Sequence, residues 1–133
     1  MRKVHILIGA LGIVIFITTG MYMRATFPAL YHGNEALRYM YRANHVYLLL
    51  ASLINLAIGI YAPTTLRGNW ARSFGLVGNV LVALSPAILT YAFFFEAPNA
   101  SPDRGFTALG VFAALLGLLA QLPNARGEAP THE

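Results

Sequence analysis

Four long apolar stretches constrain the fold of this chain more than any other feature. They cover residues of about 4–23, 35–61, 73–96 and 102–122. At 1.5 Å per residue, about 20 helical residues cross the roughly 30 Å of hydrocarbon in a bilayer. The chain is 57% hydrophobic and 11% charged, whereas a soluble domain is about 25% charged. The sequence predicts an all-α integral membrane four-helix bundle, a single domain over residues 1–133 with a flexible tail at 123–133.

Capping and turn residues set the expected boundaries of these helices. Asn34 follows a His-Gly turn and can cap the second helix, whose positive end Glu35 would meet. Pro86 removes a backbone donor from the middle of the third, so we expect a kink and a neighbour that satisfies the freed carbonyl. Ser101-Pro102-Asp103 resembles an N-cap followed by a first-turn proline and acid. We therefore expect the fourth helix to begin at about 102.

Arg2 and Lys3 precede the first stretch, as in a signal peptide. The stretch is long for a signal sequence, and no small-x-small cleavage site follows it. We expect a retained membrane anchor, with the signal peptide as the alternative.

Basic residues stand at the ends of the stretches rather than in one stripe, so membrane topology explains the net charge of +4 better than nucleic acid does. Four spans place both termini on one side. The inner ends would then hold five basic residues and the outer ends four, together with three acids, and the outer set is Arg24, Arg38, Arg42, Arg104, Glu35, Glu96 and Asp103. We expect a multi-pass protein of the bacterial inner (plasma) membrane with cytoplasmic termini.

The second stretch has a polar face. At 100° per residue, seven side chains fall within about 140° of one another, namely Arg38, Tyr41, Arg42, His45, Ser52, Asn55 and Gly59. An amide at membrane depth requires a partner, so we expect Asn55 to bond to another helix, with Asn79 and Gln121 as candidates. Together with Ser52, these residues form the expected intramembrane polar set.

The order in which the spans cross the membrane brings the outer ends of the first three spans together. We expect a ligand-binding or partner-binding cluster there, made of Arg24, Arg38, Tyr41, Arg42, His45 and Glu96. Glu96 would pair with Arg42 or His45, or alternatively with Arg24 or Arg104. The cluster is either a charge network that fastens helix ends or a pocket for an anion, a lipid headgroup or a proton.

Four histidines raise the question of haem or metal, while the absence of cysteine removes thiolate sites. His5 and His45 open spans at opposite faces, about 30 Å apart. Only His32 with His45 remains as a pair. We predict no metal and no cofactor, with haem b as the alternative.

Small residues recur at helical spacing in the first, third and fourth stretches, with Gly110, Ala114, Gly117 and Gln121 in the fourth. Such stripes let helix backbones approach closely. Packing inside the bundle explains them, and a homo-oligomer interface is the alternative.

The run from Arg38 to Tyr61, RYMYRANHVYLLLASLINLAIGIY, resembles the signature of small bacterial membrane proteins with four predicted spans, and AFFFEAP around Glu96 extends the likeness. That family has no established activity, so the resemblance implies topology alone. The position of His5 early in the first span is loosely similar to the four-helix membrane protoporphyrinogen oxidases and their copper-resistance relatives. This chain lacks the lysine of their third span and the arginine of their fourth.

No nucleophile with a base, no paired carboxylates and no phosphate loop occur in the sequence, so we predict no catalytic residue. The leading hypothesis is a non-enzymatic inner-membrane accessory protein whose outer cluster binds a partner, a lipid headgroup or an anion. The alternatives are a small transporter or channel that uses the cluster and Asn55, and a haem-binding redox protein. The expected partners are the lipid bilayer and a membrane protein or second copy, with no nucleic acid.

Overall fold

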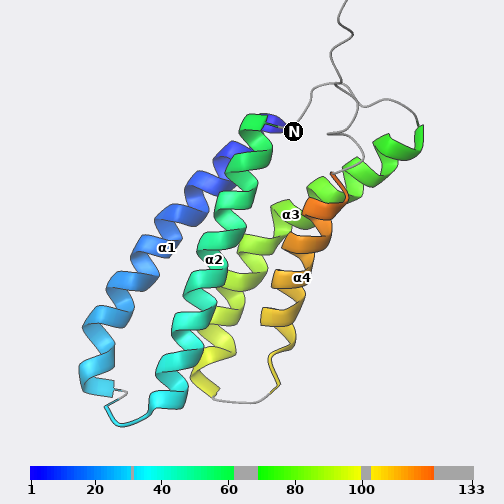
Figure 1. Ribbon diagram of the computed structural model, residues 1–133. Helices are drawn as coiled ribbons and strands as arrows, with labels where there is room; N and C mark the ends of the chain where they lie inside the picture. Colours follow the sequence, from blue (N-terminus) through cyan, green and yellow to red (C-terminus); the bar gives the residue numbers. More distant parts are fainter. Residues whose placement is uncertain (31, 62–68, 100–102, 122–133) are drawn as a thin grey trace, which may run out of the picture.

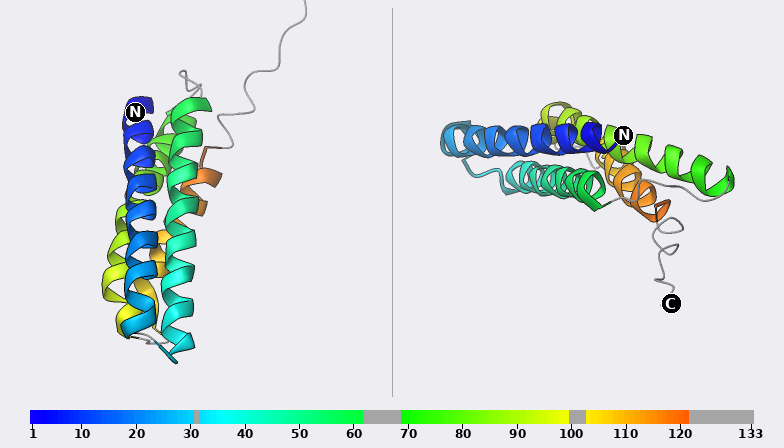
Figure 2. Two further views of the ribbon diagram at one scale, coloured as in Figure 1. Left: turned by 90° about the vertical axis from the view of Figure 1, so that its left-hand side faces the viewer. Right: turned by 90° about the horizontal axis from the view of Figure 1, so that it is seen from above.

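The computed structural model describes residues 1–30, 32–61, 69–99 and 103–121. These residues form four α-helices and one short 3-10 helix (Figure 1), namely α1 (Arg2–Leu30), α2 (Glu35–Tyr61), α3 (Asn69–Phe95), η1 (Ala97–Asn99) and α4 (Gly105–Leu119). The predicted all-α four-helix bundle is confirmed. We call the end of the bundle that holds the amino terminus the near end, and the opposite end the far end (Figure 2).

The bundle consists of two helix pairs. Helix α1 packs along α2, and α3 packs along α4, while contacts between α2 and α3 join the two pairs. Towards the near end, α3 leans away from α1 and α2 (Figure 1). An apolar core cluster fills the middle of the bundle around Leu48, Val82 and Leu89, and an aromatic cluster fills the far end around Tyr41 and Phe93.

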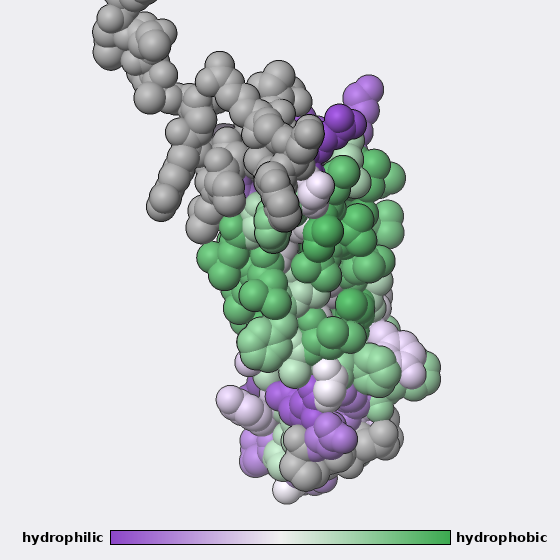
Figure 3. All heavy atoms as spheres, turned by 90° about the vertical axis from the view of Figure 1, so that its right-hand side faces the viewer, coloured by the Kyte–Doolittle hydropathy of each residue, from purple (hydrophilic) through white to green (hydrophobic). Residues whose placement is uncertain are grey.

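Three helices are long and apolar enough to cross a membrane, and they are α1, α2 and α3. On the face drawn in Figure 3, a broad apolar belt lies between two hydrophilic ends. Helix α4 has 15 residues, so it is about 22 Å long and shorter than the roughly 30 Å of hydrocarbon. The fold therefore indicates a membrane protein, in which the described part of α4 is shorter than the predicted fourth span.

The turn between α1 and α2 follows the sequence prediction at its second half. The side chain of Asn34 accepts a hydrogen bond from the backbone N–H of Leu37 at 3.1 Å, which confirms it as the cap of α2. Gly33 has a φ of 83°, a conformation that favours glycine. Helix α1 is longer than the predicted span and continues past Pro28 to Leu30.

Helix α4 begins differently from the prediction. It starts at Gly105 rather than at 102, and its N-cap residue Arg104 makes no side-chain capping bond. Ser101 and Pro102 lie outside the described residues. The oxygens that meet the free N–H groups of this helix come from Glu96, ten or more positions earlier in the chain. A carboxylate supplied by the preceding helix end thus replaces the predicted local cap.

Glycines allow the two helices within each pair to pack closely. A Cβ atom at Gly117 would lie 2.6 Å from the Val82 side chain and 2.7 Å from the carbonyl oxygen of Gly78, so only glycine fits between α3 and α4 there. Gly9 and Gly12 face Ser52 of α2 in the same way. The small-residue stripes of α1 and α4 therefore line contacts inside the bundle.

Candidate functional site

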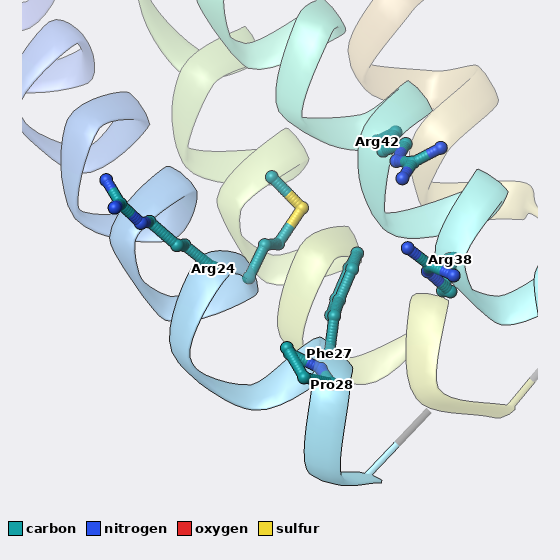
Figure 4. Close-up of a pocket in the computed structure, with 6 residues that line it drawn as sticks. Arg24, Phe27, Pro28, Arg38 and Arg42 are labelled. Atoms are coloured by element: carbon teal, nitrogen blue, oxygen red, sulfur yellow. The ribbon is translucent and has the colours of Figure 1, made fainter. Parts of the chain in front are cut away.

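A cavity of about 290 Å³ opens at the far end between α1 and α2. We call it the arginine pocket (Figure 4), and its lining residues are Met23, Arg24, Phe27, Pro28, Arg38 and Arg42. Methionine, phenylalanine and proline give it an apolar floor, and the three guanidinium groups give it a positive rim. Three of the six predicted ligand-binding residues, Arg24, Arg38 and Arg42, therefore line one cavity.

Arg38 is the arginine of the pocket for which the structure gives the most contacts. Its Nη1 donates to Glu35 Oε1 at 2.9 Å, and its guanidinium carbon lies 6.0 Å from the centre of the Phe27 ring. Its Nε is buried and has no hydrogen-bond partner among the described residues. A buried donor without an acceptor is costly, so an acceptor brought by a ligand would relieve this cost.

The arginines approach the pocket from different directions (Figure 4). The Arg38 side chain extends from α2 towards the Phe27 ring, and Arg42 stands one turn further along the same helix. Arg24 extends from α1 to the side away from both. The geometry therefore offers two neighbouring guanidinium groups on α2, with Arg24 at the opposite margin of the pocket.

Glu96 lies outside this pocket and caps α4. Its Oε1 accepts from the Phe106 N–H at 2.6 Å, and its Oε2 accepts from the Thr107 N–H at 2.9 Å. The Thr107 hydroxyl lies 2.6 Å from the same Oε2. The pairing expected with Arg42 or His45 is therefore replaced by bonds to the start of α4, because the free N–H groups of a helix attract a carboxylate.

Opposing effects act on the ionisation of Glu96. Burial raises the pKa of its carboxyl, but the bonds from the Thr107 hydroxyl and from the N–H groups of Phe106 and Thr107 lower it, as does the positive charge of Arg104. The bonds and the charge outweigh burial, so the pKa lies below its ordinary value. Of the cations considered from the sequence, Arg104 is the one that acts on Glu96.

Asn44 and Thr107 belong to this contact and were missed by the sequence analysis. Asn44 Oδ1 lies 2.9 Å from the Thr107 hydroxyl, and Arg104 Nη2 donates to the same oxygen. Asn44 is fully buried. A fully buried asparagine one residue before His45 is an intramembrane amide, which is the signal that led the sequence analysis to Asn55.

His45 and Tyr41 pack inside the bundle rather than in the arginine pocket. The His45 ring stacks on Phe16 with 3.9 Å between the ring centres, and its Nδ1 lies 3.0 Å from the Thr19 hydroxyl. That hydroxyl donates to the Phe16 carbonyl, so it accepts from His45. Tyr41 meets Phe93 edge to face at 5.0 Å. Both residues join helices, which is the fastening role considered for the predicted cluster.

Asn55 does bond to other helices, through partners that differ from those expected. Its Nδ2 donates to the Ala51 carbonyl at 2.9 Å and to the Val82 carbonyl of α3 at 2.8 Å. Val82 precedes Pro86 by four residues, so proline leaves this carbonyl without its helical donor. Asn55 and the Ser85 hydroxyl, which donates to the same oxygen at 2.9 Å, satisfy it, as a membrane helix with an internal proline requires.

Asn55 and Asn79 contact His5, and Gln121 contacts Asn79. Asn55 Oδ1 lies 2.8 Å from His5 Nδ1, and Asn79 Oδ1 lies 3.0 Å from His5 Nε2. Gln121 Nε2 donates to Asn79 Oδ1 and to the Gly75 carbonyl, both at 3.1 Å. We call these four residues the His5 chain, and three of them belong to the predicted intramembrane polar set. Ser52, the fourth member of that set, donates to the Leu48 carbonyl of its own helix.

Within the described residues, no three His, Cys, Asp or Glu side chains are grouped so that they could hold a metal ion. His5 belongs to the near end, and His45 stacks between α1 and α2. His32 is exposed in the turn after α1. The two halves of the suggested His32–His45 pair thus lie in different surroundings, one in solvent and one between helices.

The fold and the sites define a small helical-bundle membrane protein with a basic pocket at one end and a buried polar chain at the other. Comparison with protein-family models, with curated proteins and with solved structures finds no match. The resemblance of the run from Arg38 to Tyr61 to bacterial four-span proteins therefore stays a prediction.

Proposed function

We propose that this chain is a non-enzymatic accessory protein of the bacterial inner membrane, with cytoplasmic termini, whose arginine pocket binds the phosphate of an anionic lipid headgroup. The observation that carries the proposal is that Arg38, whose buried Nε lacks a hydrogen-bond partner within the described residues, lines a cavity of about 290 Å³ together with Arg24 and Arg42. Planar guanidinium groups bind phosphate oxygens through paired, charge-assisted hydrogen bonds.

The composition of the pocket favours a lipid over a small hydrophilic anion. Met23, Phe27 and Pro28 supply apolar surface beside the guanidinium groups, which suits a phosphate that continues into glycerol and acyl chains. The pocket lies at the hydrophilic far end next to the apolar belt of the bundle, where headgroups gather. Three arginines against the single carboxylate of Glu35 leave the pocket with an excess of positive charge.

Native mass spectrometry of the purified protein tests this proposal. The protein is mixed with phosphatidylglycerol or with phosphatidylcholine, and the bound lipid is counted. The double variant Arg38→Gln with Arg42→Gln should lower the affinity for phosphatidylglycerol by about 100-fold, because a hydrogen bond to a charged group contributes roughly 1.5–3 kcal/mol. Arg72→Gln, which removes an exposed charge at the near end, is the matched control and should change it little.

Two further results would distinguish a lipid phosphate from a free phosphate ester and would show that the proposal fails. Glycerol 3-phosphate that binds as tightly as the lipid would assign the pocket to a free phosphate ester. Equal binding of both lipids, or an equal loss in the Arg72→Gln control, would refute a specific phosphate site.

Transport is the second candidate function from the sequence, and it would need a polar path from the arginine pocket to the His5 chain. The buried cluster around Leu48, Val82 and Leu89 lies between these two regions. Ion flux in liposomes that contain the purified protein tests transport directly.

A further inference from the structure

The three guanidinium groups of the arginine pocket divide into two positions. Arg38 and Arg42 stand one turn apart on α2, whereas Arg24 belongs to α1 and extends away from both (Figure 4). Figure 4 shows the ring of Phe27, a buried residue of the pocket floor, between Arg24 and this pair. The pocket therefore offers two positions for an anion, one at the two arginines of α2 and one at Arg24.

The charges in the pocket suit two anions better than one. Glu35 lies 2.9 Å from Arg38 and offsets the charge of that guanidinium. Among the described residues, no carboxylate forms a salt bridge with Arg24 or with Arg42. One positive charge therefore stays without a counter-charge on each of the two helices. A phosphodiester carries one negative charge, as each phosphate of DNA does, so a single phosphodiester balances the charge on only one helix.

Each anion position continues into exposed apolar side chains of its own helix. At 100° per residue, Met21 and Ile17 lie within about 60° of Arg24 on α1, and both are exposed. Val46 lies within about 40° of Arg42 on α2 and is exposed as well. These side chains lead from the far end towards the middle of the bundle. Acyl chains that follow a phosphate at either position therefore find an apolar surface beside them.

We propose that the arginine pocket binds a lipid with two phosphodiester groups joined through a glycerol, with one phosphate at Arg38 and Arg42 and the other at Arg24. This inference rests on the proposed function, because it names the class of lipid that the same pocket takes. The axes of two packed helices lie about 8–10 Å apart, and a glycerol bridge together with long arginine side chains spans such a separation. One pair of acyl chains then follows α1, and the other pair follows α2.

The bridge between the two phosphates is what distinguishes this lipid from others. When one phosphate is bound, the bridge makes the contact of the second phosphate intramolecular, so the joined lipid binds more tightly than a lipid with a single phosphate. A lipid whose two phosphates are linked directly, as in a prenyl diphosphate, places both charges at one position. Its binding should therefore depend on Arg38 and Arg42 and little on Arg24.

Native mass spectrometry with cardiolipin and with phosphatidylglycerol tests this inference. The unchanged protein should bind cardiolipin about tenfold more tightly, since a hydrogen bond to a charged group at the second position contributes about that factor. Arg24→Gln should remove the preference, because it lowers the affinity for cardiolipin by about tenfold and leaves the affinity for phosphatidylglycerol nearly unchanged. Arg72→Gln, which removes an exposed cation at the near end, is the matched control and should keep the preference.

Three results would overturn the inference. The first is equal affinity of the unchanged protein for the two lipids. The second is a preference for cardiolipin that persists in Arg24→Gln, because it would come from the additional acyl chains. The third is an affinity for farnesyl diphosphate that falls in Arg24→Gln as much as the affinity for cardiolipin does. Each of them leaves the proposed function standing, which fails separately if Arg38→Gln with Arg42→Gln does not weaken the binding of phosphatidylglycerol.

Discussion

Replacing Asn55 with leucine should destabilise the bundle far more than an ordinary polar substitution in a membrane helix. Asn55 joins three helices, since it donates to the freed Val82 carbonyl of α3 and accepts from His5 of α1. Interhelical hydrogen bonds in membranes are worth about 0.6 kcal/mol on average and at most about 1.7. Losing two of them, with His5 Nδ1 left buried and unpaired, should lower the free energy of unfolding by about 2 kcal/mol.

Ser52→Ala provides the matched control. Ser52 is equally buried on the same helix, but its hydroxyl donates to the Leu48 carbonyl of that helix, at 2.6 Å. A bond within one turn can be kept when helices separate, so we expect this substitution to cost below about 0.5 kcal/mol. Reversible unfolding in mixed detergent micelles, followed by circular dichroism, measures both free energies.

A double-mutant cycle with Pro86→Ala tests the cause. Alanine restores the N–H that the Val82 carbonyl lacks, so in this background Asn55→Leu should lose only the bond to His5. The cost of Asn55→Leu should then fall by about 0.6 kcal/mol, the value of one such bond. Additive effects of the two substitutions, or an Asn55→Leu cost no larger than that of Ser52→Ala, would refute the role assigned to Asn55.

Three other substitutions test the remaining contacts. Folding lowers the pKa of Glu96, so the stability that its carboxylate contributes is complete above the ordinary pKa and is lost as the pH falls through the lowered value. Glu96→Gln should cost about 1 kcal/mol at pH 7, as loss of a helix cap does. It should also flatten the acid side of a plot of stability against pH. Gly117→Val should separate α4 from Val82, where a Cβ would lie at 2.6 Å, and the loss of about 2 kcal/mol expected from overpacking is measured by the same unfolding titration. Glu35→Gln should release Arg38 from its ion pair and raise the affinity for phosphatidylglycerol by up to about fivefold, since an exposed pair contributes roughly 0–1 kcal/mol; a lower affinity would contradict the arginine pocket.

Much of the fold could be predicted because membrane helices follow simple length and composition rules. The apolar stretches predicted the four helices, and Asn34 was predicted correctly as the cap of α2. Pro86 predicted a carbonyl that lacks its helical donor and needs a donor from a neighbour. The identity of that neighbour could not be predicted, because it depends on which face of α2 turns towards α3. The same limit applies to Glu96, whose partner is a helix start ten residues later rather than a side-chain cation.

The predicted cluster does not form one site, for a related reason. Helical periodicity places Arg38, Tyr41, Arg42 and His45 on one broad face, but neighbouring helices divide such a face into sectors. Arg38 and Arg42 meet the end of α1 and form the pocket, whereas Tyr41 meets α3 through Phe93 and His45 meets α1 through Thr19. From the sequence, His5 was considered as a metal ligand and as a point of family likeness, and its contacts with Asn55 and Asn79 could not be predicted because they depend on how two other helices are turned.

Helix α4 contacts the rest of the bundle at its start, in its middle and just after its end. Apolar burial gives little drive for a helix to associate inside a bilayer, because lipid is as apolar as leucine, so close packing and polar bonds decide where a helix sits. Glu96 bonds to the start of α4, glycines let its middle approach α3, and Gln121, just after the helix, donates to the Gly75 carbonyl of α3. Of these three attachments, the first depends on ionisation, because it needs the Glu96 carboxylate. Protonation of Glu96 at low pH should therefore weaken the attachment at the start of α4, while the glycine contacts and the bonds of Gln121 stay unchanged.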